Sequence, residues 1–187
     1  KASDVASKHG LSSHLDGARL MNAAIANRCS PKDLTRGFTT VSLCLSKGLG
    51  APVGSVLTGS SNFIKEARRA RKMLGGGMRQ AGILAACGLV AVKTQVDRLE
   101  EDHRLASRLA TELSQIPDIQ TESEGANTNM VFIKVLDQHR DPLKAFLKNK
   151  GILISGRPPT FRLVIHRDIN EKDIPTTVAA FAEYFRQ

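Results

Sequence analysis

The stretch VSLCLSKGLGAPVGS, residues 41–55, decides the fold of this chain. Its first six residues alternate apolar and small polar side chains, which is the period of a half-buried β-strand. Lys47 follows directly, and Gly48 and Gly50 remove Cβ atoms where a ligand would need room. We expect Lys47 to be partly desolvated there, which favours a neutral amine able to attack a carbonyl carbon. The alternative is a surface lysine in the loop after an edge strand.

A second stretch, HLDGAR at residues 14–19, places an acid in a comparable position. Asp16 ends a short apolar run and precedes Gly17 and a predicted helix over residues 18–28. Carboxyl ends of neighbouring parallel strands meet at one sheet edge, where α/β folds bind ligands. Pyridoxal phosphate requires this pair: a lysine for its aldehyde, and a carboxylate that keeps its ring nitrogen protonated. Asp16 could instead cap the following helix.

Three segments together resemble the threonine aldolases. They are HLDGAR at 14–19, LSKGLGAPVGS at 45–55 and RKMLGGGMRQ at 71–80, in the family's order and at compatible spacing. These enzymes belong to the β-eliminating lyase group of fold-type I, which uses pyridoxal phosphate. The resemblance covers the whole of this chain but not the whole family chain. It implies an α/β fold: the carboxyl-terminal part of a large domain, then a small α/β domain, with the amino-terminal part of the large domain absent.

The resemblance also implies roles for individual residues. Lys47 binds the cofactor aldehyde, Asp16 pairs with its ring nitrogen, and Arg19 lies near the ring oxygen and the substrate carboxylate. Arg162, a lone arginine in the apolar run TFRLVI, corresponds to the family's carboxylate-binding arginine. Arg19 could instead lie on a helix surface, and Arg162 could point to solvent, because strands alternate faces.

Two further basic residues are weaker candidates. Lys72 and Arg79 flank the glycine run 75–77, and the resemblance places them near the site or at a subunit contact. A solvated basic helix face is the alternative. The family's phosphate-binding loop and its ring-stacking histidine correspond to sequence before residue 1, so we assign no histidine here to that role. We therefore expect a fragment or a split protein with an open sheet edge and exposed core.

Composition excludes several other classes. The 187 residues carry a net charge of +9, but aromatic residues make up 4% and tryptophan is absent, which argues against nucleic-acid binding. The longest apolar run is too short to span a membrane. The spacing of cysteines and histidines matches no zinc pattern, so we predict no metal. Three widely spaced cysteines indicate reduced thiols and a cytoplasmic protein.

The pattern of elements predicts two domains, residues 1–96 and 97–187. In the first we expect strands over 11–16, 40–45 and 55–58, with helices over 1–9, 18–28, 31–36, 61–74 and 79–96, the last buried on most faces. In the second we expect an amphipathic helix from residue 97 to Pro117, strands over 128–135, 152–154 and 162–165, and helices over 142–150 and 171–185.

The activity implied by the resemblance is aldol cleavage of L-threonine or L-allo-threonine to glycine and acetaldehyde. A homo-oligomer, dimer or tetramer, is implied in the same way. Two alternatives stay open. The chain could belong to another pyridoxal-phosphate lyase or racemase that uses Lys47 and Asp16, or it could be a truncated, non-catalytic product.

Overall fold

The computed structural model describes residues 1–121, 128–157 and 159–186. They form two compact units, Lys1–Arg98 and Leu99–Gln187, whereas the sequence placed the domain boundary between residues 96 and 97. Within the described ranges, we find no helix with the length and apolar character needed to span a bilayer.

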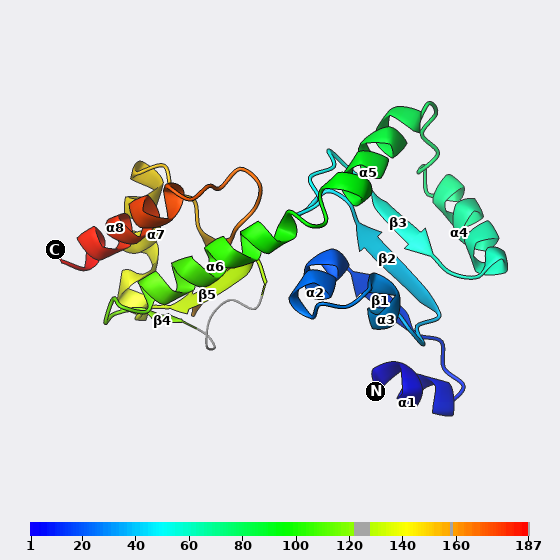
Figure 1. Cartoon of the computed structure of the whole chain (residues 1–187), viewed down its shortest axis with the longest axis horizontal. Helices are drawn as coiled ribbons and strands as arrows, with labels where there is room; N and C mark the ends of the chain where they lie inside the picture. Colours follow the sequence, from blue (N-terminus) through cyan, green and yellow to red (C-terminus); the bar gives the residue numbers. More distant parts are fainter. Residues whose placement is uncertain (122–127, 158, 187) are drawn as a thin grey trace. The chain divides into compact units, whose positions relative to one another are not determined.

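The first unit is built on a three-stranded mixed sheet (Figure 1). Strands β1 (His14–Gly17) and β2 (Thr40–Cys44) are parallel neighbours, and β3 (Ser55–Thr58) pairs antiparallel with β2. The predicted strands are confirmed, although β1 begins three residues later than expected. The parallel register sets Asp16 beside Ser42, so the ends of β1 and β2 reach the same sheet edge.

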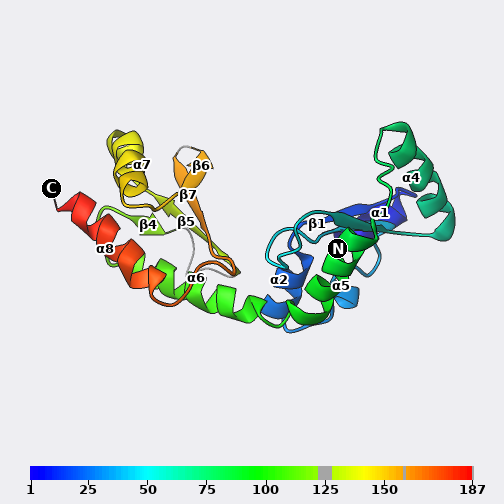
Figure 2. The ribbon, with the colours of Figure 1, turned by 90° about the horizontal axis from the view of Figure 1, so that it is seen from above.

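Five helices accompany this sheet. They are α1 (Ala2–Lys8), α2 (Leu20–Ala26), α3 (Pro31–Leu34), α4 (Ser61–Met73) and α5 (Gly82–Thr94). Local signals set their ends. Ser30 caps α3 by accepting from the Asp33 N–H at 3.2 Å, Ser60 caps α4, and Gly10 follows α1 with φ +64°. Helices α2 and α5 lie on the same side of the sheet (Figure 2).

Gly17 is required where β1 meets β2. A Cβ at this residue would lie 2.3 Å from the backbone oxygen of Ser42, a contact that backbone movement alone can relieve. We therefore expect Gly17→Ala to destabilise the first unit by about 1–3 kcal/mol, the usual cost of overpacking. Urea unfolding measures this. Gly82→Ala is the matched control because a Cβ there meets nothing within 4 Å, so a loss of stability in the control as large as in Gly17→Ala would contradict the explanation.

Much apolar surface of the first unit is exposed. This agrees with the exposed core expected for a fragment, but it disagrees with the burial predicted for helix α5. Helix α5 was expected to be buried on most faces, and this was wrong: Ile83 is 75% exposed and Leu89 56%. Among the described residues α5 covers Leu45, which a Cβ at Gly88 would approach to 3.0 Å. All four residues of β3 are also exposed. The expected exposed core is thus present, because a sheet of three strands covers one side of α5 only.

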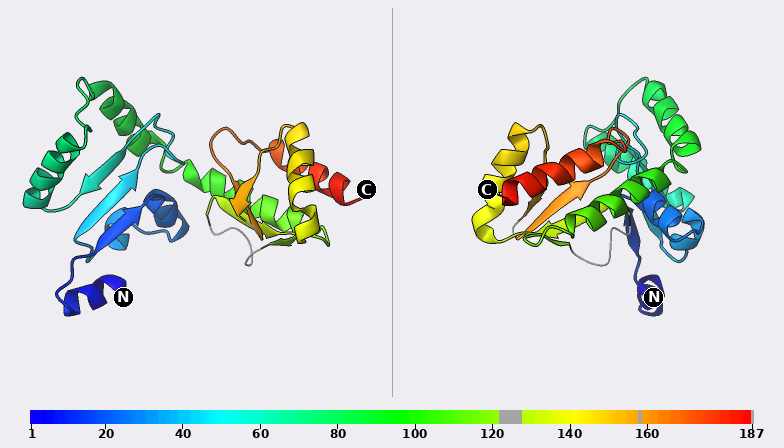
Figure 3. Two further views of the ribbon diagram at one scale, coloured as in Figure 1. Left: turned by 180° about the vertical axis from the view of Figure 1, so that it is seen from behind. Right: turned by 60° about the vertical axis from the view of Figure 1, so that its left-hand side comes forward.

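The second unit contains a four-stranded antiparallel sheet in the order β4-β5-β7-β6. Its strands are β4 (Gln120–Thr121), β5 (Met130–Lys134), β6 (Ser155–Arg157) and β7 (Thr160–Val164). Helices α6 (Leu99–Leu113), α7 (Arg140–Asn149) and α8 (Asp173–Phe185) complete it, with a 3-10 turn η1 (Asp137–His139). Helices α6 and α8 lie side by side (Figure 3).

The core of the second unit follows the predicted periodicities. Leu105, Leu109 and Leu113 of α6 are buried, and the strands alternate so that Phe161 and Leu163 point inward. One prediction was wrong: residues 152–154 form no strand, because the ladder with β7 begins at Ser155, which faces Arg162.

Candidate active site

Asp16 lies at the end of β1, where the parallel pair β1–β2 opens. It is exposed, and its Oδ1 accepts a hydrogen bond from the Ala18 N–H at 3.1 Å. Helix α2 has Arg19 as its N-cap, so Asp16 supports the turn before the helix rather than capping the helix itself. Asp16 thus lies at the carboxyl end of a strand, as predicted, and its role as the partner of a ring nitrogen stays a prediction.

Lys47 lies in a hydrogen-bonded loop after β2. The Gly50 N–H donates to the Lys47 carbonyl at 2.8 Å, and the Ala51 N–H donates to the Leu45 carbonyl at 3.0 Å. Gly50 adopts φ +71°, which favours glycine. Gly48 and Leu49, which follow Lys47, are buried, but Lys47 itself is exposed. The expected partial desolvation of Lys47 was therefore wrong, because the described residues bury Gly48 and Leu49 but leave Lys47 exposed.

Arg19 and Lys47 line the same small hollow. Its walls come from the start of α2, the end of β2 and the loop after it, and the lining includes Asn22 and Cys44. The structure thus brings together two of the predicted site residues, Arg19 and Lys47, which are 28 positions apart in the sequence. Asp16 is not among the lining residues. The sequence interpretation missed Asn22, although three-residue spacing from Arg19 places both on one face of α2.

Cys44 gives the hollow a polarised thiol. Its Sγ lies 3.6 Å from Ser46 Oγ. Burial raises the pKa of the thiol, whereas the contacts with Ser46 and the charge of Lys47 lower it, and the net result is a pKa below the ordinary value. The Cys44 side chain is partly exposed in the same hollow as Lys47.

Arg162 belongs to the second unit. It lies in β7 between the buried Phe161 and Leu163, and its own side chain is exposed on the opposite face of the sheet. Its role in binding a substrate carboxylate stays a prediction, and its alternative, a strand arginine that faces solvent, agrees with its exposure in this unit.

Lys72 and Arg79 are exposed and do not line the hollow with Lys47. Lys72 lies in the last turn of α4, and its Nζ is 2.8 Å from the place that a Cβ at Gly77 would occupy. Its side chain therefore folds over the glycine turn. The predicted involvement of both residues in binding stays a prediction.

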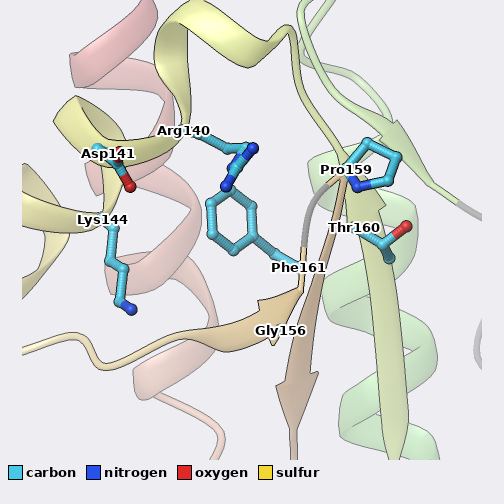
Figure 4. Close-up of a pocket in the computed structure, with 7 residues that line it drawn as sticks. All are labelled: Arg140, Asp141, Lys144, Gly156, Pro159, Thr160 and Phe161. Carbon is cyan, nitrogen blue, oxygen red and sulfur yellow. The ribbon is translucent and has the colours of Figure 1, made fainter.

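A second hollow lies in the second unit (Figure 4). Helix α7 contributes Arg140, Asp141 and Lys144, and strand β7 contributes Phe161 to the lining. None of the residues predicted for the site lines it. It has one acid and two bases, but no feature that resembles the constellation around Lys47.

A sequence model of the β-eliminating lyase family matches residues 1–136. The chain belongs to this family. One curated relative is low-specificity L-threonine aldolase 1 of Arabidopsis thaliana, 42% identical over 187 residues, or 98% of this chain and 52% of the relative. The low specificity L-threonine aldolase of Escherichia coli K12 is also 42% identical, over 92% of this chain and 50% of its own length. The chain thus spans about half the length of these relatives.

Solved structures give the same fold. A putative L-allo-threonine aldolase from Listeria monocytogenes superposes with a TM-score of 0.80 at 19% identity, covering 97% of this chain and 54% of that one. The present chain therefore has the fold-type I architecture that its sequence predicted.

Proposed function

We propose that this chain is part of a pyridoxal-phosphate-dependent aldolase that cleaves L-threonine or L-allo-threonine to glycine and acetaldehyde. The observation that supports the proposal is the parallel pairing of β1 and β2, with Asp16 at the end of β1 and with Arg19 and Lys47 lining one hollow. The names of the family's relatives support the substrate class.

The residues at this edge fit the cofactor chemically. The primary amine of Lys47 and the guanidinium of Arg19 belong to residues that line one hollow, and the carboxylate of Asp16 lies at the end of the adjoining strand β1. Pyridoxal phosphate, when bound, supplies an aldehyde for amines and a ring that accepts an electron pair released at the substrate's Cα.

Each residue then has one task. Lys47 would hold the cofactor through Nζ at its aldehyde carbon, the same carbon at which the substrate amine would bind. Asp16 keeps a proton on the ring nitrogen, because a carboxylate stabilises the adjacent positive charge. Arg19, whose guanidinium can bind two oxygens at once, orients the substrate carboxylate or the ring oxygen.

Asp16 gives a test of this assignment. We expect Asp16→Asn to keep cofactor attachment at Lys47 but to lower the rate of aldol cleavage by about 10²–10³-fold, since an amide leaves the ring nitrogen unprotonated. The assay measures acetaldehyde release by the protein that contains this chain. Asp4→Asn, on exposed helix α1, is the control. Equal activities of the wild type and Asp16→Asn would contradict the role given to Asp16.

The reaction class is tested by product analysis. Acetaldehyde release supports the aldolase, whereas ammonia or pyruvate release indicates another lyase of the same fold. Failure of the purified chain to retain the cofactor after gel filtration supports the truncated, non-catalytic alternative. We further propose a cytoplasmic homo-oligomer as the working form, and sedimentation at several protein concentrations tests its assembly.

A further inference from the structure

The loop that carries Lys47 is held from a distant part of the chain. A guanidinium nitrogen of Arg98, Nη2, donates to the backbone oxygen of Gly48 at 3.4 Å, across 50 residues of sequence. The backbone hydrogen bonds within the loop are accepted by the carbonyls of Leu45 and Lys47, whereas Arg98 donates to a different carbonyl, that of Gly48. Arg98 and Gly48 both lie within the first unit.

Helix α5 explains how Arg98 reaches this position. The helix packs on the end of β2, where Gly88 lies close to Leu45 Cδ1, and Ala91 is 2% exposed. The chain leaves the helix after Thr94 and reaches Arg98 within four residues. Two contacts from one stretch therefore bracket Lys47: Gly88 against Leu45 before it, and Arg98 on Gly48 after it.

The position of the loop backbone is important because the Lys47 side chain is exposed rather than packed among the described residues. The described residues bury Gly48 and Leu49 but leave the Lys47 side chain open. The direction in which Nζ points is then set by the backbone on either side of it. A charged donor on the carbonyl of a buried residue restrains the backbone at that residue, although this hydrogen bond is long at 3.4 Å.

We propose that Arg98 is a positioning residue for Lys47, acting through the carbonyl of Gly48. The inference rests on the role proposed above for Lys47. Arg98 is not among the residues that line the hollow; it holds the loop through Gly48 so that the amine meets the cofactor aldehyde in one orientation. Loss of Arg98 then loosens residues 47–51 while the rest of the sheet keeps its structure.

The test compares four forms of this chain: wild type, Arg98→Met, Arg98→Lys and Arg68→Met. Arg68 is an exposed arginine of α4 and serves as the matched control. Hydrogen exchange of the peptide that contains residues 47–51 reports the loop. To probe the amine, pyridoxal phosphate is added to each form and the adduct is fixed with borohydride. The measured quantity is the rate of labelling at Lys47 divided by the rate at Lys65 on the same chain.

We expect Arg98→Met to speed exchange in residues 47–51 by roughly tenfold, and to slow relative labelling of Lys47 by a similar factor. Arg98→Lys, which keeps a charged donor, should recover part of both effects, and Arg68→Met should match the wild type. Unchanged loop exchange in Arg98→Met overturns the proposal. Faster exchange throughout the first unit also overturns it, since the role is then general stability.

The two proposals fail differently. If Lys47 in the wild type labels no faster than Lys65, the proposed function loses its support, whereas loop exchange still decides whether Arg98 positions the backbone. If Lys47 labels preferentially in the wild type and equally well in Arg98→Met, the proposed function stands and the positioning role is overturned.

Discussion

Lys47→Ala should abolish retention of pyridoxal phosphate through a covalent bond and reduce aldol cleavage by at least about 10³-fold. The reason is chemical: no other residue lining the hollow, among those the structure describes, is a lysine. Removal of its amine takes away the attachment of the cofactor and the group that the substrate amine displaces. The backbone of the loop should keep its structure, because its main-chain hydrogen bonds and the bond from Arg98 to the Gly48 carbonyl do not use the Lys47 amine.

The measurement is a visible absorbance spectrum after cofactor addition and gel filtration, followed by borohydride fixation and peptide mass analysis. Lys65→Ala is the matched control, since Lys65 is an exposed lysine of α4 in the same unit. The control should retain the absorbance band and the mass label on the peptide with residue 47. Persistence of a fixed adduct in Lys47→Ala at the wild-type level would show that another lysine holds the cofactor.

Local sequence signals predicted the elements well because their causes are local. Ser30 followed by Pro31 marks the start of a short helix, and Gly10 closes the first one, since caps depend on two or three neighbouring residues. The alternation in residues 41–46 likewise gave β2 its correct place. The same reasoning put Asp16 at the end of one strand and Lys47 after another, and these two strands are parallel neighbours in the structure.

Properties that depend on distant residues were harder to predict. The exposure of Lys47 and of Ile83 on α5 depends on which other residues cover them. An apolar sequence indicates that a helix prefers to be buried, but it does not identify the element that buries it. The contact of Arg98 with Gly48 joins residues 50 apart, and neither residue belongs to a periodic pattern that links them. Asn22 was recoverable, because its spacing from Arg19 is helical.

The second unit should depend on Phe181 for its stability. The ring is 0% exposed and belongs to the core cluster that α8 shares with α6, α7 and the sheet. We expect Phe181→Ala to lower the free energy of unfolding of this unit by about 3–5 kcal/mol, because the deletion removes buried apolar contacts and leaves a cavity. Such a loss is comparable to the whole stability of many small domains.

Urea unfolding followed by far-UV circular dichroism measures the effect, and limited proteolysis with mass analysis assigns it to the second unit. Leu153→Ala is the matched control: it also truncates a large apolar side chain in the same unit, but Leu153 is 81% exposed, so its expected cost is below about 0.5 kcal/mol. A similar cost for the two variants would contradict a core built around Phe181. Because Lys47 lies in the other unit, we expect Phe181→Ala to leave the labelling preference of Lys47 over Lys65 unchanged under conditions where the first unit is folded.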